Sequence, residues 1–370
     1  MKILVLTPRL NLSGVPLAQI RLSKALKKYG HNVKLIAGIQ DKSINDSHLS
    51  GVNVEIIKKN KVRNMLFFLV KKIRSEKPDL IFTAEDHLTV ITLIAILITR
   101  SRAKLSGSSR VGADDLEAYG GKLFSQYWKS NFLKIIFKLV AWRADALTCV
   151  AKDMVPHYKK IFKNQKHTFA YNIIVDEESI ARSNEAVNHK WIDKKNDALI
   201  VAAGRLDKEK GFKDLINAIW EVTKTRCVKL ILIGDGPEKE NLQLQINELG
   251  LKDSIDLVGF QSNPLKFFAH SDVFVLSSYA EGLPNVLVES MMCGCTPVAT
   301  NCVTGPREVL QDGEYGYLVS LKNPKEMSKA IIAAIDNPIS HQNLSIAIKP
   351  FETKNVLNRH FELLELEERV

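Results

Sequence analysis

The feature that most constrains the fold is an alternation of short apolar runs with amphipathic stretches, which occurs twice along the chain. Such an alternation is typical of βαβ units and a parallel sheet. In the first half the segments are residues 3–6, 17–28, 33–37, 80–83, 88–99 and 146–150. In the second half they are residues 199–203, 212–223, 230–233, 238–249, 255–257, 273–276, 285–292 and 297–299. The sequence therefore predicts an α/β protein with two open parallel sheets.

The alternation stops in a polar stretch near the middle of the 370-residue chain, which is long enough for two domains. We expect a first Rossmann-like domain at residues 1–176, an interdomain segment at 177–197 and a second Rossmann-like domain at 198–350. We expect a final helix, 351–370, to cross back to the first domain. Two lobes of this kind hold a ligand in the cleft between them, at the carboxyl ends of the strands.

The charge is distributed unevenly between the two halves. The net charge is +11, of which residues 1–180 carry +15 and residues 181–370 carry −4. A polarised charge suggests that the first half faces an anionic partner. Basic and apolar residues mix in three stretches there, at 58–77, 100–104 and 129–143.

The third stretch is a candidate surface helix for anionic lipid. On a helical wheel, Lys134 and Lys138 share one face, and Phe132, Ile136 and Leu139 share another. The alternative is a helix packed on the core with a solvated basic face. Nucleic acid is a third option, but no recognition module accompanies the charge.

The cysteines and the apolar runs bear on the compartment. Five cysteines cannot all pair, which favours a reducing environment. Cys293, Cys295 and Cys302 cluster, but no further ligand completes a zinc site at the usual spacing, so we interpret them as core thiols. The longest uncharged apolar run has eleven residues, against the ~20 that a membrane-spanning helix needs, and the chain starts without a signal pattern. We expect a cytoplasmic protein that does not span a membrane.

Two segments that follow strands carry candidate chemistry. Residues 204–211 place Arg205 and Lys210 among glycines, which suits a diphosphate; the alternative is a solvated loop with interchangeable basic residues. Residues 279–289 lead through Pro284 into a helix whose free N–H groups can bind an anion. Glu281 and Glu289 flank that entry; the alternative makes one a dipole partner and the other an ordinary helix acid.

Across residues 199–320 the ordered motifs resemble the family 4 retaining glycosyltransferases of GT-B fold. The stretch 304–308 resembles members that add hexoses or N-acetylhexosamines in bacterial surface-polysaccharide and glycan assembly. The matching residues are Gly204, Arg205, Leu206, Lys210, Gly211, Gly234, Asp235, Gly236, Pro237, Val258, Gly259, Phe260, Glu281, Gly282, Leu283, Pro284, Asn285, Glu289, Cys293, Gly294, Pro297, Val298, Gly305, Pro306, Arg307, Glu308, Tyr315 and Gly316.

The resemblance implies a nucleotide-sugar donor bound mainly by the second domain and an acceptor on the side of the first. Arg205 and Lys210 would hold the diphosphate, and Glu281 the donor sugar. Glu289 would bind the ribose and Phe260 the base. The remaining donor-binding candidates are the residues around the helix entry, Gly282, Leu283, Pro284, Asn285 and Val286. No Asp-x-Asp motif is present, so we expect no metal and no other cofactor.

The first half matches the family pattern less well. Gly14 stands between a strand and a helix, where the family often has paired glycines near the donor phosphate. Many members carry a histidine in the run that corresponds to residues 103–110, around Gly107, and none is present here. His87 is the nearest substitute, although it can equally be a capping or surface residue. Arg110 and Asp114 are further candidates for contacts with the acceptor or the reacting sugar.

We therefore expect a retaining, metal-independent transferase that moves a hexose or N-acetylhexosamine from a UDP-sugar to a lipid-linked or polysaccharide acceptor, including lipopolysaccharide. It would lie in the cytoplasm, peripheral on the inner face of the cell membrane, and bind no nucleic acid. The alternative is a non-catalytic scaffold or sugar-nucleotide-binding subunit of the same fold, suggested by the missing histidine and the single glycine. An epimerase lacks support from the motifs. Dinucleotide, P-loop and nucleophile-elbow motifs are absent, which excludes hydride transfer, P-loop hydrolysis and that type of acyl transfer.

Overall fold

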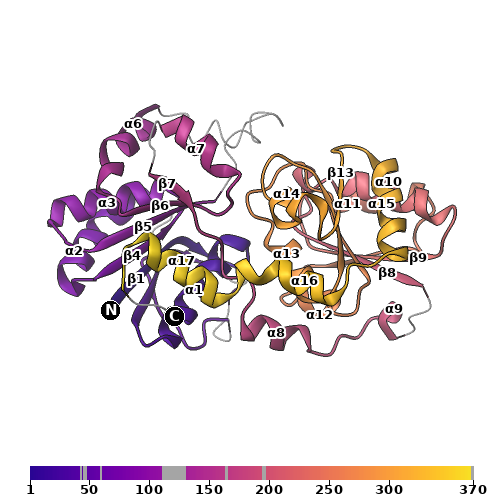
Figure 1. The fold of residues 1–370 in the computed structure, drawn as a ribbon, viewed down its shortest axis with the longest axis horizontal. Coiled ribbons are helices and arrows are strands. Elements are labelled where there is room, and N and C mark those ends of the chain that lie inside the picture. The colour runs from indigo at the N-terminus through magenta and orange to yellow at the C-terminus, as the bar shows by residue number, and fades with distance from the viewer. Residues whose placement is uncertain are drawn as a thin grey trace. The chain divides into compact units, whose positions relative to one another are not determined.

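The computed structural model describes residues 1–41, 44, 48–58, 61–110, 131–162, 166–193 and 197–367. The chain divides into two compact units. Unit 1 comprises Met1–Ile173 with Phe351–Val370, and unit 2 comprises Ile174–Pro350. In each unit, helices pack against a parallel sheet (Figure 1).

Unit 1 contains a sheet with the strand order β3-β2-β1-β4-β5-β6-β7, in which every described pairing is parallel. Its strands are β1 (Lys2–Leu10), β2 (Asn32–Gln40), β3 (Asn53–Ile56), β4 (Leu80–Ala84), β5 (Lys104–Ser109), β6 (Ala146–Cys149) and β7 (His167–Phe169). Its helices are α1 (Gly14–Lys28), α2 (Leu66–Glu76), α3 (Asp86–Thr99), α6 (Asn131–Val140), α7 (Met154–Phe162) and α17 (Thr353–Leu363), with 3₁₀ turns at Val62–Met65 and Ala141–Arg143.

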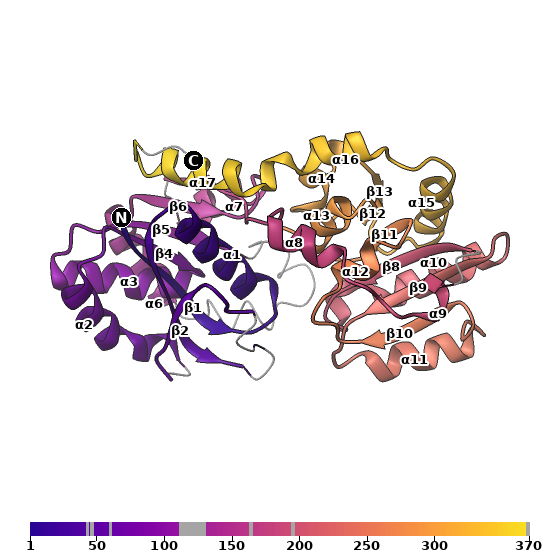
Figure 2. The same ribbon diagram turned by 90° about the horizontal axis from the view of Figure 1, so that it is seen from below.

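Unit 2 repeats this architecture, with the strand order β10-β9-β8-β11-β12-β13 and parallel pairing throughout its described strands (Figure 2). Its strands are β8 (Ala198–Ala203), β9 (Val228–Ile233), β10 (Ile255–Gly259), β11 (Val273–Leu276), β12 (Thr296–Thr300) and β13 (Tyr317–Val319). Its helices are α8 (Glu177–Ser183), α9 (Lys190–Asp193), α10 (Phe212–Thr223), α11 (Lys239–Glu248), α12 (Leu265–Phe268), α13 (Asn285–Met292), α14 (Pro306–Val309), α15 (Pro324–Asp336) and α16 (His341–Ile348). Short 3₁₀ turns lie at Lys208–Lys210, Gln311–Gly313 and Lys349–Phe351.

The sequence pattern explains why these segments form these elements. The central strands β4 and β12 are buried along their whole length, as expected of parallel strands that are covered on both faces. Helix α10 buries Leu215, Ile219 and Val222, which recur at the spacing of one helical face, against the sheet of unit 2. Each unit thus has its own hydrophobic core, which allows it to hold its loops rigidly.

The strand order reverses once in each sheet. In unit 1 the chain builds β1, β2 and β3 outward and then returns to the other side of β1 with β4; in unit 2 it does the same with β8, β9, β10 and β11. At such a reversal the loops after the two neighbouring strands leave in opposite directions and open a crevice at the carboxyl edge of the sheet, where ligands bind. The loops after β8 and β11 are those that carry the sequence-predicted residues of unit 2.

The C-terminal helix belongs to unit 1. Helix α17 lies beside α1 in both views (Figures 1 and 2), and its Leu357 and Phe361 are fully buried in the core of that unit. The Phe361 ring meets His31 edge-on at 5.8 Å, and His360 meets Phe82 in the same way at 5.2 Å. Residues 177–193, expected as part of an interdomain segment, form α8 and α9 within unit 2, and Asp176 caps α8 by accepting a hydrogen bond from the Ser179 N–H at 2.7 Å.

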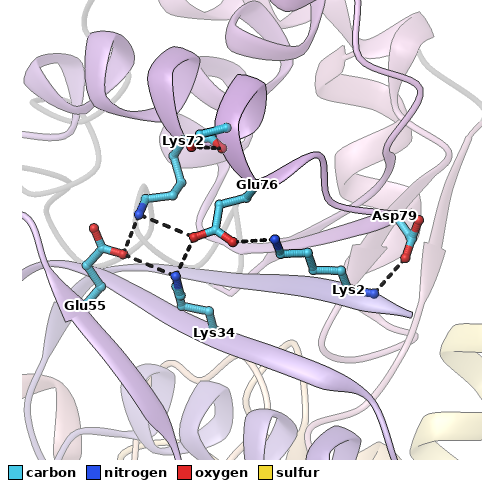
Figure 3. Close-up of polar contacts among 7 residues, drawn as sticks. Lys2, Lys34, Glu55, Lys72, Glu76 and Asp79 are labelled. Carbon is cyan, nitrogen blue, oxygen red and sulfur yellow. Dashed lines mark hydrogen bonds and ion pairs between the residues drawn. The ribbon is translucent and has the colours of Figure 1, made fainter.

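An ion-pair network ties α2 to the amino-terminal edge of the sheet in unit 1 (Figure 3). Glu76, at the end of α2, contacts Lys2 at 2.7 Å and also pairs with Lys34 and, at 3.5 Å, with Lys72. Lys72 reaches Glu55 on β3 at 2.7 Å. Because Glu76 is shared by cations from β1, β2 and α2, it is the centre of the network.

We expect Glu76→Gln to lower the free energy of unfolding of unit 1 by about 1–3 kcal/mol at pH 7, because the clustered ammonium groups lose their central carboxylate. Hydrogen bonds from Lys2 and Lys34 lower the pKa of Glu76 to about 2, below the ~4.3 of an exposed glutamate. The stabilisation is therefore complete above about pH 4.3 and is lost as the pH falls toward 2. Urea unfolding followed by circular dichroism at pH 7 and at pH 3 measures both effects.

Glu362→Gln is the matched control in the same unit. Glu362 pairs with Arg359 at 2.9 Å, but its side chain is 69% exposed, so the change should cost less than about 0.5 kcal/mol at either pH. A loss in Glu76→Gln that stays constant from pH 7 to pH 2.5 would contradict the assignment, because it would not follow the titration of the carboxylate.

Candidate functional site

The strand reversal in unit 2 brings together two residues that are far apart in the sequence. Lys210 ends the 3₁₀ turn after β8, and Glu281 lies in the loop after β11. The Lys210 Nζ atom donates a hydrogen bond to Glu281 Oε1 at 2.6 Å. Their side chains are 27% and 11% exposed, so the pair is half-buried and one side of it remains accessible.

Hydroxyl groups of neighbouring residues fix the position of Glu281. The Ser278 hydroxyl donates to the same Oε1 atom at 2.6 Å, and the Thr304 hydroxyl donates to the Glu281 carbonyl oxygen. The Thr300 hydroxyl donates to the carbonyl of Leu276 at 3.2 Å, at the end of β11 where this loop begins. The carboxylate thus keeps one orientation without any ligand, which is the preorganisation that an electrostatic site requires.

The backbone joins the two loops directly. The Ser277 hydroxyl donates to the Lys210 carbonyl at 2.7 Å, and the Tyr279 N–H donates to the Glu209 carbonyl at 2.8 Å. Gly211 has φ +64°, and a Cβ there would lie 2.1 Å from the Ser277 carbonyl oxygen. This position therefore needs glycine for both its conformation and its space, and the close approach is what places Lys210 against Glu281.

The charge state of Lys210 follows from its partner. Burial disfavours the ammonium, but the charge of Glu281 and the hydrogen bond to it outweigh burial and raise the pKa of Lys210. Asp207 and Glu209 add to the effect. Lys210 is therefore a fixed cation at every physiological pH.

Arg205 lies in the same loop but not in this contact. Its side chain is 71% exposed, and its Nε atom is 3.7 Å from Asp207 Oδ2. The loop around it is held by the loop after β9: the Leu206 N–H donates to the Asp235 carbonyl at 3.0 Å, and a Cβ on Gly236 would lie 2.4 Å from the Leu206 carbonyl oxygen. Arg205 thus projects from a rigid backbone into solvent, where its guanidinium can meet an anion.

The helix entry predicted from the sequence forms at the expected place. Helix α13 begins at Asn285 directly after Pro284, four residues beyond Glu281, and its first N–H groups lack intrahelical acceptors. The donor-binding candidates Gly282 and Leu283 lie in the connecting turn, which Gly305 supports: a Cβ there would lie 2.4 Å from the Gly282 carbonyl oxygen. Lys210, Glu281 and the start of α13, including Val286, therefore form one edge of unit 2.

Two further predicted residues lie at other positions in unit 2. Glu289 is buried on the second turn of α13, and its charge acts with burial to raise the pKa of the Cys293 thiol to about 12. Phe260 follows β10, two strands away from β8, and is 53% exposed. The sequence-predicted residues of unit 2 thus include a buried acid on α13 and an exposed ring after β10.

In unit 1 the candidates also gather at the carboxyl edge. Gly14 is the first residue of α1, directly after the loop that leaves β1. His87 is the second residue of α3, after β4, with its Nε2 atom 3.4 Å from Glu85 Oε2, and burial lowers the pKa of His87 to about 4, so it is neutral. Arg110 follows β5 and donates a hydrogen bond to Asn172 Oδ1. Asp114 lies outside the described residues.

The sequence reasoning missed two acids at this edge, Glu85 and Asp86. The buried Asp86 accepts hydrogen bonds from Ser109 at 2.5 Å and Tyr158 at 3.3 Å, and burial raises its pKa to about 6. Burial also raises the pKa of Glu85 to about 7. The available signal was their position, two consecutive acids directly after an apolar strand.

Within the described ranges, no three His, Cys, Asp or Glu side chains come together as a set that could hold a metal ion. Among the described residues, Cys293, Cys295 and Cys302 form no disulfide bond, and Cys295 donates to the Phe268 carbonyl at 3.0 Å. In the same part of the chain, no helix has both the length and the hydropathy to cross a membrane.

Comparison with known proteins shows similarity to glycosyltransferases. The family model "Glycosyl transferases group 1" matches residues 183–350, nearly all of unit 2. An uncharacterized glycosyltransferase of Methanocaldococcus jannaschii is 32% identical over 259 residues, covering 68% of this chain and 62% of the relative. The N-acetylgalactosamine-N,N'-diacetylbacillosaminyl-diphospho-undecaprenol 4-alpha-N-acetylgalactosaminyltransferase of Campylobacter jejuni is 32% identical over 219 residues, 57% of each chain. This chain thus spans less than two thirds of the curated relatives that it matches.

The whole chain resembles solved structures in fold. Anabaena Alr3699/HepE in complex with UDP gives a TM-score of 0.77 at 21% identity, covering 99% of this chain and 100% of that one. The fold class expected from the sequence, α/β of the GT-B type with two Rossmann-like domains, is confirmed. Residues 183–350, which make up most of unit 2, thus match the glycosyl transferases group 1 domain.

Proposed function

We propose that this chain is a retaining glycosyltransferase that moves a hexose or N-acetylhexosamine from a UDP-sugar to a lipid-linked or polysaccharide acceptor without a metal ion. The observation that carries the proposal is the Lys210–Glu281 pair at 2.6 Å, which lies beside the start of α13 in a glycosyl transferases group 1 domain. Fixed cations and helix N–H groups suit a diphosphate leaving group, which needs negative charge compensated as its bond to the sugar breaks.

Each group would have a defined part in the reaction. Lys210 and Arg205 bind the diphosphate, and Glu281 accepts hydrogen bonds from the donor sugar. The bond between the anomeric carbon and the phosphate oxygen breaks, and the acceptor oxygen bonds to that carbon on the same face. The acceptor proton passes to the leaving phosphate, which is therefore both the leaving group and the base. Lys210 stabilises its negative charge in both roles.

The rest of the UDP-sugar would extend along the carboxyl edge of unit 2. The backbone N–H groups of Leu283, Asn285 and Val286 contact phosphate and sugar, Glu289 binds the ribose hydroxyls and Phe260 covers the base. In support, the structural neighbour HepE has been solved with UDP and with UDP-glucose. In unit 1, Gly14 allows the backbone to approach the phosphate from the start of α1.

A membrane-bound acceptor is the second element of the proposal. The Campylobacter relative is named for a diphospho-undecaprenol acceptor. Helix α6 and the turn after it expose Ile135, Leu139 and Trp142, spaced along one helical face, next to the exposed Lys138. The exposed apolar face differs from the expected one, because Ile136 is half-buried and Ile135 is exposed in its place. Phe137 packs in the core and thereby sets the rotation of the helix about its axis. An apolar stripe with basic neighbours is suited to anionic lipid.

Lys210→Met and Glu281→Gln should each lower the rate of transfer by about 100-fold or more, because each change removes a preorganised charge and leaves the opposite charge of the pair without its partner. The double variant should lose little more than either single variant, since the two side chains act as a unit. The assay is UDP release from UDP-GlcNAc, UDP-GalNAc and UDP-glucose with a polyprenyl-diphosphate-linked sugar as acceptor. Lys208→Met, an exposed cation in the same turn, is the control and should stay within about twofold of wild type.

The same assay separates the enzyme from a non-catalytic subunit. UDP binding measured by calorimetry without release of UDP from any donor would support the sugar-nucleotide-binding subunit instead. Transfer within a few-fold of wild type in both Lys210→Met and Glu281→Gln would show that the pair does not serve the reaction.

Glu289→Gln should weaken UDP binding by about tenfold, because a charged acceptor for the ribose hydroxyls becomes a neutral one. Isothermal calorimetry with UDP and with uridine measures the loss, which should be similar for both ligands, since both contain the ribose. Glu314→Gln, in the same unit but outside the proposed site, should bind UDP as wild type does. Unchanged affinity for both ligands would remove Glu289 from the ribose site.

Ile135→Ser combined with Leu139→Ser should lower binding to phosphatidylglycerol-containing vesicles by about tenfold or more, because both side chains lose apolar area that the lipid would bury. Cosedimentation measures it, with phosphatidylcholine vesicles as the uncharged comparison. The melting temperature should not fall, since both side chains are exposed. Leu244→Ser, an exposed leucine of unit 2, is the control. Equal binding by all variants would remove α6 from the proposal.

A further inference from the structure

The two sheets place a glutamate at the same topological position. In each unit the chain reverses strand order beside its first strand, and the first strand after the reversal is β4 in unit 1 and β11 in unit 2. The loop after β11 carries Glu281, and the residue directly after β4 is Glu85. Both acids therefore lie at the crevice where open α/β sheets bind ligands.

Glu85 has a strained backbone. Its φ is +75° and its ψ is 137°, a conformation that residues other than glycine avoid. The surrounding hydrogen bonds hold it there: its N–H donates to the Ser108 carbonyl at 2.9 Å, and its carbonyl accepts from the N–H groups of Leu88 and Thr89, each at 3.1 Å. These contacts with β5 and α3 impose the conformation.

The side chain is also unfavourable for folding at neutral and alkaline pH. Burial raises the pKa of Glu85 to about 7, and the charge of Asp86 adds to this, whereas Arg110 and Arg9 lower it. His87 lies at 3.4 Å and is neutral because burial lowers its pKa to about 4, and the Tyr158 hydroxyl donates to Asp86 at 3.3 Å. An acid with a raised pKa stabilises the fold only while protonated, so its contribution is lost as the pH rises from about 4.3 through 7.

Glu85 thus destabilises the fold through its backbone and through its carboxylate, which are independent effects. Strain of this kind is typical of functional sites. The Arg110 guanidinium supplies a compensating charge, and its buried Nε–H has no hydrogen-bond partner among the described residues. A polar donor left unsatisfied next to a strained acid points to a ligand.

We propose that Glu85 binds the acceptor, accepting hydrogen bonds from hydroxyl groups of its sugar, while Arg110 holds the charge of the carboxylate in place. The inference rests on the proposed glycosyl transfer and assigns the acceptor sugar to the crevice of unit 1. A sugar fits this site better than a free anion, because the ionised Glu85 and Asp86 carboxylates would repel an anion. The ionised carboxylate is the stronger acceptor, so acceptor binding should weaken as the pH falls below 7.

The test compares Glu85→Gln and Glu85→Gly with wild type, with UDP-GlcNAc and UDP-GalNAc as donors and a polyprenyl-diphosphate-linked N-acetylhexosamine as acceptor. Glu85→Gln should raise the acceptor KM at least tenfold, leave UDP affinity by calorimetry unchanged and abolish the rise of acceptor KM below pH 7. Glu85→Gly should lose acceptor binding equally and raise the melting temperature at pH 8 by about 2–4 °C, because glycine tolerates the backbone.

Lys77→Gly is the matched control. Lys77 also has a positive φ, +46°, but lies before β4, at the opposite edge of the same sheet. The Lys77→Gly variant should have a higher melting temperature, as Glu85→Gly should, but the acceptor KM of wild type. The comparison separates relief of backbone strain from loss of acceptor binding.

Three results would overturn the inference. A lower melting temperature in both Glu85 variants would make the residue structural. An unchanged acceptor KM would remove it from the acceptor site, and a raised donor KM alone would assign it to the donor. If wild type binds UDP but transfers to no acceptor, or binds no UDP, the proposed function itself fails and the inference fails with it, a result visible before any variant is made.

Discussion

The reversal of strand order beside β1 and beside β8 is the constraint on which both functional edges depend. Parallel strands present all their carboxyl ends at one edge, and the reversal parts the loops there. In unit 2 it brings Lys210 and Glu281, 71 residues apart, to 2.6 Å. In unit 1 it places the entry of α1 at Gly14 next to β4, the strand that ends directly before Glu85. The topology of the two sheets thus determines where the candidate residues lie in each unit.

At the two edges of the unit 1 sheet, the charge of a glutamate has opposite effects on the stability of the fold. Glu76 and Glu85 lie nine residues apart on either side of β4. At the amino-terminal edge, cations lower the pKa of Glu76 to about 2, and its charge stabilises the fold. At the carboxyl edge, burial raises the pKa of Glu85 to about 7, and its charge destabilises the fold. Stability is thus provided at one edge, and the residues with a binding role lie at the other, which is the usual division between scaffold and site.

The periodicity of the sequence predicted α1, α3, α10, α11 and α13, but not the 13-residue α15. The bounds expected for α10 and α13 agree with the structure, because each has a clear apolar face and a glycine or proline at its start. The short edge strands β3, β7 and β13 were missed, since three or four residues carry too little pattern and their burial is incomplete. The exposed face of α6 was predicted one position away from Ile135, because packing of Phe137 sets the rotation of the helix.

The sequence by itself determined the class of fold, the motifs of unit 2 and the presence of Arg205, Lys210 and Glu281 in segments that follow strands, with Glu289 in the helix beyond, because local patterns and turn residues encode these. Only the tertiary structure decided which charges meet. Lys210 contacts Glu281 while Arg205 remains in solvent, because Gly211 lets two loops approach within hydrogen-bonding distance. Glu85 acquires its strain and its raised pKa from β5, α3 and burial. The pKa of a side chain depends on neighbours that the chain brings from elsewhere, and no local pattern contains them.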